Sequence, residues 1–123
     1  MILKDLAKCG RITATDGTHL SELLHPARDS LELSYSIAHA EVLPGASSLP
    51  HRLKKSSEVY FIMEGRGEMH IDEEQAQVDT GQAIFIPPGS WQYICNTGNI
   101  ILKFLCIVSP VWRAEDEELK GQD

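Results

Sequence analysis

Residues 45–65 read GASSLPHRLKKSSEVYFIMEG, and this stretch decides the fold. His51 and Leu53 are two residues apart and therefore project from one face of a strand. A four-residue loop then lets Leu53 pair with Glu58, which places His51 opposite Tyr60. Continuing the alternation adds three further residues to this face: Ile62, Met69 and Ile71. We expect the face to be the interior of a β-structure.

Short apolar runs separated by turn residues continue on both sides of this stretch. From residue 31 onwards apolar and polar residues alternate, which predicts a strand that runs to about residue 43. Turn sequences then recur about every 8 to 12 residues, which is typical of an antiparallel sandwich or barrel. Residues 100–108 are mostly apolar, and we expect a strand there that is covered on both faces.

A second stretch, residues 81–96, reads GQAIFIPPGSWQYICN. Together the two stretches resemble the signature motifs of the cupin family, G-x5-H-x-H-x4-E-x6-G and G-x5-P-x-G-x2-H-x3-N. Eight of the ten signature residues stand at the family's spacing: Gly45, His51, Glu58, Gly65, Gly81, Pro87, Gly89 and Asn96. The resemblance implies an all-β barrel of the cupin type, also called a double-stranded β-helix or jelly roll.

This resemblance predicts one cupin domain over residues 1–123. Its motif core is residues 45–96, and we expect the N-terminal strands in residues 1–43. The last residues, 110–123, are rich in charged side chains and are expected to form a solvated polar tail.

The two signature residues that differ are both metal ligands in the family. Leu53 and Gln92 stand where the family has histidines. The resemblance therefore implies a site for Mn, Fe, Ni or Zn formed by His51, Glu58 and Gln92, with the amide oxygen of Gln92 as the third donor. Replacing two imidazoles weakens a site for such ions. We expect a divalent metal to bind weakly, or no cofactor at all.

Three functions are compatible with these residues. The leading hypothesis is a small-molecule-binding cupin that acts as a metal-dependent isomerase or oxygenase. It would be sugar isomerase-like, would act on a sugar or a small oxygenated acid, and would use Glu58 or His51 to move a proton. The second is a metal-free epimerase-type enzyme with His51 as the base, Tyr60 as the acid and Glu58 orienting the imidazole. The third is a non-catalytic module that binds an effector in the barrel. Beside them stands a structural role, in which His51 and Glu58 form a buried pair that only supports the fold.

The composition argues against other classes of partner. The chain of 123 residues has a formal net charge of −7, whereas nucleic acids and anionic membranes select basic surfaces. No stretch approaches about 18 apolar residues, and the first residues lack the order of a signal peptide. We expect a cytoplasmic protein.

The chain has three cysteines, Cys9, Cys95 and Cys106, without a Cys-x-x-Cys spacing. They suggest no disulfide framework, and we expect the last two to be buried thiols.

Other histidine and aromatic side chains have weaker signals. His39 lies on the apolar face of its expected strand and is a candidate additional pocket residue. Trp91 and Tyr93 flank the last ligand position and are candidates for closing the mouth of the pocket, or for core or dimer packing. Phe61 and Met63 are expected on the outer face, where an isolated barrel would expose them. We therefore expect a homodimer.

Overall fold

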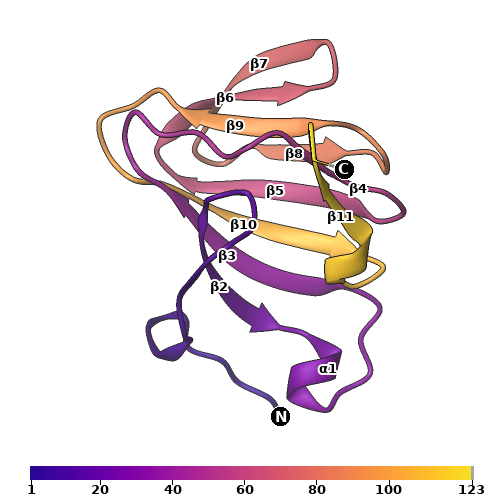
Figure 1. Ribbon diagram of the computed structural model, residues 1–123. Helices are drawn as coiled ribbons and strands as arrows, with labels where there is room; N and C mark the ends of the chain where they lie inside the picture. Colours follow the sequence, from indigo (N-terminus) through magenta and orange to yellow (C-terminus); the bar gives the residue numbers. More distant parts are fainter. Residues whose placement is uncertain (123) are drawn as a thin grey trace.

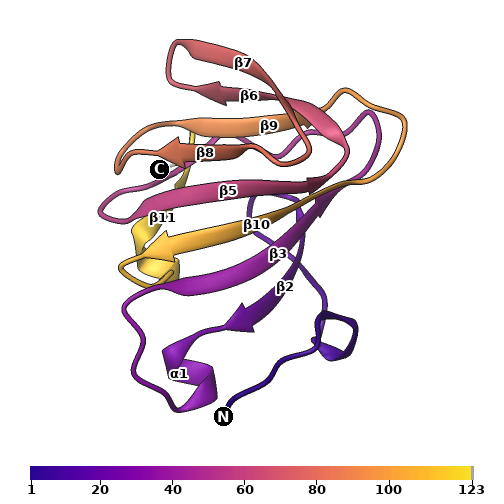
Figure 2. The ribbon, with the colours of Figure 1, turned by 180° about the vertical axis from the view of Figure 1, so that it is seen from behind.

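Two antiparallel sheets make up most of the computed structural model, which describes residues 1–122. The first sheet has six strands in the order β1-β2-β3-β10-β5-β8, and the second has five in the order β11-β4-β9-β6-β7 (Figures 1 and 2). The strands are β1 (Ile12–Thr13), β2 (His19–Leu24), β3 (Ser36–Val42), β4 (His51–Leu53), β5 (Ser57–Glu64), β6 (Arg66–Ile71), β7 (Glu74–Asp79), β8 (Ala83–Ile86), β9 (Gln92–Asn96), β10 (Leu102–Ser109) and β11 (Glu117–Leu119). The predicted all-β fold is confirmed.

Helical structure is limited to three short segments: η1 (Leu6–Lys8), α1 (Pro26–Asp29) and η2 (Ala114–Asp116). At the start of α1, the His25 ring accepts a hydrogen bond from the Ala27 backbone N–H at 3.1 Å. Pro26 fits the first helical position because its missing N–H would have no partner there. Within residues 1–122, none of the helices has the length and apolar character needed to cross a bilayer.

The core lies between the two sheets, where every second residue of the central strands points inwards. Ile62, Ile94, Leu102 and Phe104 are completely buried. The interior face predicted from the alternation is confirmed, because six of its seven residues are buried and Ile71 packs against them at the margin. Period-2 alternation thus places the correct side chains inside.

The predicted strand pairing within residues 51–58 is wrong, although these residues do occupy the predicted interior face. Leu53 pairs with Glu117 of β11, whereas Glu58 pairs with Ile86 and Val108 in the other sheet. The segment between β4 and β5 therefore crosses from one sheet to the other rather than closing a hairpin. Residues that we expected to be neighbours on one sheet face each other across the interior instead.

The C-terminal residues form structure where a solvated tail was expected. Asp116 is 2% exposed, and its carboxylate accepts hydrogen bonds from the backbone N–H groups of Lys55 at 2.9 Å and Ser56 at 3.1 Å. These bonds satisfy two donors at the crossing between the sheets. Strand β11 then adds to the edge of β4, so the polar composition of this segment is that of an edge strand.

Strand β3 begins at Ser36, five residues later than predicted. The alternating residues before it belong to the connection that follows α1, and the last pairing of β2 with β3 is Leu24 with Ile37. Alternation indicates which face a residue would occupy in a strand, but a strand begins only where a partner is available.

Two glycines allow β6 to approach its neighbours. Gly65 has a φ of 88° in the turn between β5 and β6, a conformation that residues with a side chain rarely adopt. At Gly67 an added Cβ would lie 2.5 Å from the carbonyl oxygen of Cys95. The side chain of Asn96 secures the same end of the sandwich by donating to the carbonyls of Val42 at 2.9 Å and Ile100 at 2.8 Å.

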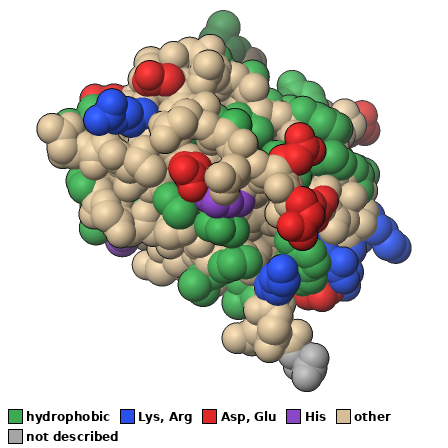
Figure 3. Space-filling view, turned by 90° about the horizontal axis from the view of Figure 1, so that it is seen from above, with side chains coloured by type: hydrophobic (Ala, Val, Ile, Leu, Met, Phe, Trp, Pro, Cys, Tyr) green, Lys and Arg blue, Asp and Glu red, His purple; other side chains and the backbone are tan. Residues whose placement is uncertain are grey.

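Charged groups of both signs are mixed with apolar ones on the surface in Figure 3. The Lys and Arg side chains on this face form small separate groups among acidic and apolar side chains. The face offers no broad basic surface, in keeping with the net charge of −7.

Candidate functional site

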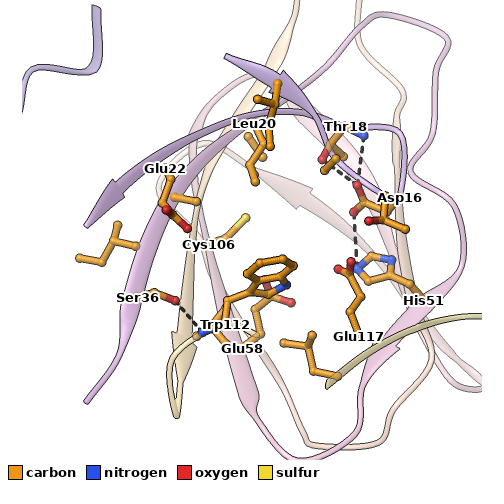
Figure 4. Close-up of a pocket in the computed structure, with 18 of the residues that line it drawn as sticks. Asp16, Thr18, Leu20, Glu22, Ser36, His51, Glu58, Cys106, Trp112 and Glu117 are labelled. Atoms are coloured by element: carbon orange, nitrogen blue, oxygen red, sulfur yellow. Dashed lines mark hydrogen bonds and ion pairs between the residues drawn. The ribbon is translucent and has the colours of Figure 1, made fainter. Parts of the chain in front are cut away.

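A cavity of about 330 Å³ opens inside the sandwich, and both sheets contribute to its walls. Strands β2, β3, β5 and β10 provide one wall, and β4 and β11 provide the opposite one (Figure 4). Gly10, the N-terminal residues 12–16 and Trp112 also line it. A volume of this size is at the lower end of the range of small-molecule pockets.

His51 is held in one orientation by acceptors at both ring nitrogens. Its Nδ1 atom lies 2.7 Å from the carbonyl oxygen of Leu49, and its Nε2 atom lies 3.5 Å from Oδ2 of Asp16. The other oxygen of Asp16 accepts from the N–H of Thr18 at 3.1 Å and from its hydroxyl at 2.8 Å (Figure 4). The carbonyl oxygen of Leu49 can only accept a hydrogen bond, so Nδ1 is the donor in that contact, and Nε2 faces the Asp16 carboxylate.

Glu58 is a buried carboxyl group with a strongly shifted pKa. Burial raises the pKa of Glu58 to about 7, while the hydrogen bond from Gln92 and the charge of His51 lower it. The donor in that hydrogen bond is Nε2 of Gln92, at 2.9 Å from Oε1 of Glu58. Near neutral pH Glu58 is therefore divided between its acid and its base form.

Tyr60 lies beside Glu58 on the inward face of β5 and also lines the cavity. Its ring packs against Phe104 with 4.5 Å between the ring centres. Burial and the nearby charge of Glu58 raise the pKa of Tyr60 well above its usual value. The phenol keeps its proton at neutral pH and can donate a hydrogen bond.

Glu117 of β11 brings a second carboxyl group to the same wall as His51 (Figure 4). Burial raises the pKa of Glu117, whereas the charge of His51 and the hydrogen bonds with Thr15 and Trp112 lower it. Asp16 adds to the rise through repulsion between like charges. The pocket thus contains more carboxyl groups than basic side chains.

The structure brings most of the predicted site residues together. His51, Glu58 and Tyr60 all line the cavity. Gln92 lies on β9, where it pairs with His51 of the neighbouring strand β4. Its side chain donates a hydrogen bond to Glu58 but does not line the cavity. Its Oε1 atom is buried without a hydrogen-bond partner. The roles assigned to these residues remain predictions.

Three other candidates lie away from the pocket. His39 is buried, but its strand neighbours Ala38 and Ala40 line the cavity and His39 does not. Trp91 packs under the guanidinium of Arg52, 4.4 Å from the ring centre. Tyr93 stacks on His70 with 4.2 Å between the rings. Both aromatic residues therefore pack on the outer face of the second sheet, and neither lines the cavity. Cys106 is buried as predicted and lines the cavity, whereas Cys95 is only half-buried.

The sequence interpretation missed Asp16, Trp112 and Glu117. Asp16 stands in the expected turn at Thr15 to Thr18, and a turn signal does not show that a side chain points into a barrel. Glu117 and Trp112 belong to the C-terminal segment that was expected to be solvated. The only available signal was the tryptophan itself, which is a large apolar residue next to a charged segment.

The donor groups of the pocket do not fit a transition-metal site. A single imidazole, that of His51, lines the cavity, and its Nε2 atom faces Asp16. One oxygen of Glu58 accepts from Gln92, and the leucine at position 53 offers no donor. Among residues 1–122, no three His, Cys, Asp or Glu side chains are grouped so that they could hold a metal ion. Manganese, iron, nickel and zinc sites in proteins need a fuller set of such ligands.

The fold and the pocket define a cupin barrel, and comparison with known proteins agrees. The chain belongs to the cupin family, because the family described as "Cupin domain" matches residues 38–108. An uncharacterised protein of Methanocaldococcus jannaschii is 41% identical over 104 residues, which covers 85% of this chain and 82% of that protein. An oxalate-binding protein of Thermotoga maritima is 31% identical over 71 residues, or 58% of this chain and 59% of that protein.

Solved structures show the same fold at lower identity. A crystal structure described as a predicted oxalate decarboxylase from Thermotoga maritima has a TM-score of 0.76 at 24% identity, covering 89% of this chain and 99% of the other. The nucleoside dehydratase Pac13, from Streptomyces, also has a TM-score of 0.76, at 17% identity, covering 97% of this chain and 90% of the other. The predicted family and barrel are confirmed.

Proposed function

We propose that this cupin binds a small organic molecule in its barrel and moves protons on it without a resident metal. The observation that carries the proposal is the pair formed by Glu58 and His51. Both side chains are buried and line one cavity. The pKa of Glu58 is raised to about 7 by burial, which is the range in which a carboxyl group serves as acid and base.

We assign Glu58 and His51 roles opposite to those expected for a metal-free enzyme. Nδ1 of His51 is occupied by the carbonyl oxygen of Leu49, so its Nε2 atom, which faces Asp16, is the one that exchanges a proton with the substrate. Ionised Glu58 takes a proton from a carbon next to a carbonyl group, and His51 gives its Nε2 proton to the carbonyl oxygen. The product is an enol, and return of a proton to the same carbon on its other face completes an epimerisation. Where that carbon carries a hydroxyl group, the enol is an enediol: a proton added to the former carbonyl carbon, with loss of the proton of this hydroxyl group, completes an isomerisation. Tyr60 is placed to orient an oxygen of the substrate.

The relatives are compatible with this proposal at the level of the scaffold. Pac13 is named a nucleoside dehydratase, and removal of water also needs one group to take a proton from carbon and one to protonate oxygen. The metal-dependent isomerase or oxygenase has less support, since the donor set lacks the two imidazoles that Leu53 and Gln92 replace.

The test is proton exchange in heavy water. A panel of sugars, amino sugars and small keto acids is incubated with the protein, and deuterium at carbon is followed by NMR. We expect exchange with some members of the panel, loss of at least a hundredfold in Glu58→Gln, and no change in Glu118→Gln. In the control variant, the altered residue pairs with Arg52 outside the pocket, with a distance of 3.2 Å.

A non-catalytic effector module is the second candidate. Gln92 holds Glu58 by a hydrogen bond, which is also how a purely binding pocket would fix a carboxyl group. Molecules that bind in the cavity but never exchange their protons would favour this function over the enzyme.

A further inference from the structure

Four carboxyl groups and two basic side chains line the cavity. The acidic residues are Asp16, Glu22, Glu58 and Glu117, and the basic ones are Arg28 and His51. Two ionisable neutral groups, Tyr60 and Cys106, complete the set, and burial raises the pKa of both, which keeps them uncharged. Acidic groups are therefore in excess.

Each of the two basic side chains already faces a carboxylate. Nη1 of Arg28 lies 3.2 Å from Oε1 of Glu22, and Nε2 of His51 lies 3.5 Å from Oδ2 of Asp16. Glu58 and Glu117 form no ion pair with any Lys, Arg or His among the described residues. The protein leaves two carboxyl groups of the pocket without a cationic partner.

The other walls suit an organic cation as well. Trp112, Tyr60 and Phe104 line the same cavity, and aromatic faces attract ammonium groups through their quadrupoles. Trp112 belongs to the same C-terminal segment as Glu117 and is hydrogen-bonded to it. Figure 4 shows Trp112, Glu58 and Glu117 around one space.

From these observations we infer that the natural ligand carries a positive charge, such as an ammonium group, that binds between Glu58 and Glu117. The inference rests on the proposed function and names the class of its ligand. A buried carboxylate without a cationic partner is costly, and a ligand cation supplies the missing charge. An anion would instead lie against two carboxyl groups, so the ligand named for the oxalate-binding relative does not suit this pocket.

Three probes with one carbon skeleton test the sign of the charge. They are 3,3-dimethylbutan-1-amine, 3,3-dimethylbutan-1-ol and 3,3-dimethylbutanoate, which differ in their head group alone. Each is titrated at pH 8 into the full chain at up to millimolar concentration, and binding is followed by NMR shifts of the pocket residues. We expect the amine to bind at least tenfold more tightly than the carboxylate.

Charge variants locate the effect. Glu117→Gln and Glu58→Gln are each expected to weaken binding of the amine at least threefold and to leave the alcohol unchanged. Glu118→Gln removes the same charge one residue away, on the other face of β11, and is expected to change nothing. If a variant fails to fold, the affinities of the three probes for the unaltered protein still show whether the pocket prefers a cation.

The outcomes separate the inference from the proposed function. Equal affinities for the three probes, or tighter binding of the alcohol or carboxylate, would overturn the cationic ligand and leave small-molecule binding intact. Failure of all three probes to shift any pocket resonance would contradict both.

Discussion

Glu58 is a buried pocket residue that loses hydration when it ionises. It is 7% exposed, and burial raises its pKa to about 7 against the hydrogen bond from Gln92 and the charge of His51. Its protonation therefore changes near neutral pH, and the charge of the pocket changes with it. This single residue links the stability of the barrel to the chemistry proposed for it.

Glu58→Gln is predicted to stabilise the protein at high pH. In the unfolded chain the carboxyl group ionises near 4.5, and in the folded protein it does so near 7. The folded state holds the extra proton between these values, so the stability present below pH 4.5 is lost as the pH rises through 7. The loss amounts to about 3 kcal/mol, and an amide cannot undergo it.

Urea unfolding of both proteins at several pH values between 4 and 8 measures this effect. The difference in unfolding free energy between variant and wild type should grow with pH, and Glu118→Gln should show no such trend. A difference that is independent of pH would mean that Glu58 is not desolvated.

We predict that the pocket lacks a metal site because Leu53 and Gln92 stand in place of two histidine ligands. Leu53→His combined with Gln92→His adds two imidazoles near His51 and Glu58. Affinity for nickel or zinc should rise at least tenfold, or about 1.4 kcal/mol. Calorimetric titration compares the double variant with wild type and with Leu53→His alone. Equal affinities in a folded double variant would show that these positions do not converge.

At the scale of elements, the period-2 pattern predicts which face of a strand each residue occupies, but it does not predict which strands pair with each other. The alternation through β5 and β6 correctly predicted that Tyr60, Ile62 and Met69 point inwards. It could not show that β4 pairs with β11 and β9 rather than with β5, since a loop of four residues can close a hairpin or cross between sheets. The cupin spacing preserved the inward positions, whereas the pairing depends on Asp116, which is distant in the sequence.

Asp116→Ala is predicted to destabilise the protein by about 3 kcal/mol. The change leaves the buried N–H group of Ser56 and the partly buried one of Lys55 without their acceptor, and a buried donor without a partner costs about 1–3 kcal/mol. Urea unfolding gives the free energy, and hydrogen exchange should become faster at both amides. Glu115→Ala, an exposed change in the same turn of η2, should have little effect. Similar unfolding free energies for the two variants would show that the C-terminal segment is a solvated tail, as the sequence predicted.

At the scale of the whole molecule, the pocket is assembled from both ends of the chain and from the motif core. Asp16 comes from the N-terminal segment, Glu117 from the last strand, and His51 and Glu58 from between them. The family motifs made the central pair predictable. The other two carboxyl groups were not predictable, because only the folded barrel brings their segments together.

The outer face of the six-stranded sheet supports the proposal of a homodimer. Phe61, Met63 and Phe85 are 40%, 46% and 62% exposed on β5 and β8, and apolar groups gathered on one face favour association. We predict a dimer at micromolar concentration in analytical ultracentrifugation, and a monomer for Phe61→Ser combined with Phe85→Ser. Leu49→Ser, at another exposed site, should remain dimeric. A wild-type monomer would refute the proposal.

The central claim is that the barrel holds a carboxyl group poised near neutral pH beside His51. It is tested most directly by NMR titration of the Glu58 side-chain carboxyl carbon, assigned by its absence in Glu58→Gln. We predict a midpoint near pH 7, because burial raises the pKa of Glu58. A midpoint near 4.5, the ordinary value for a glutamate, would contradict it.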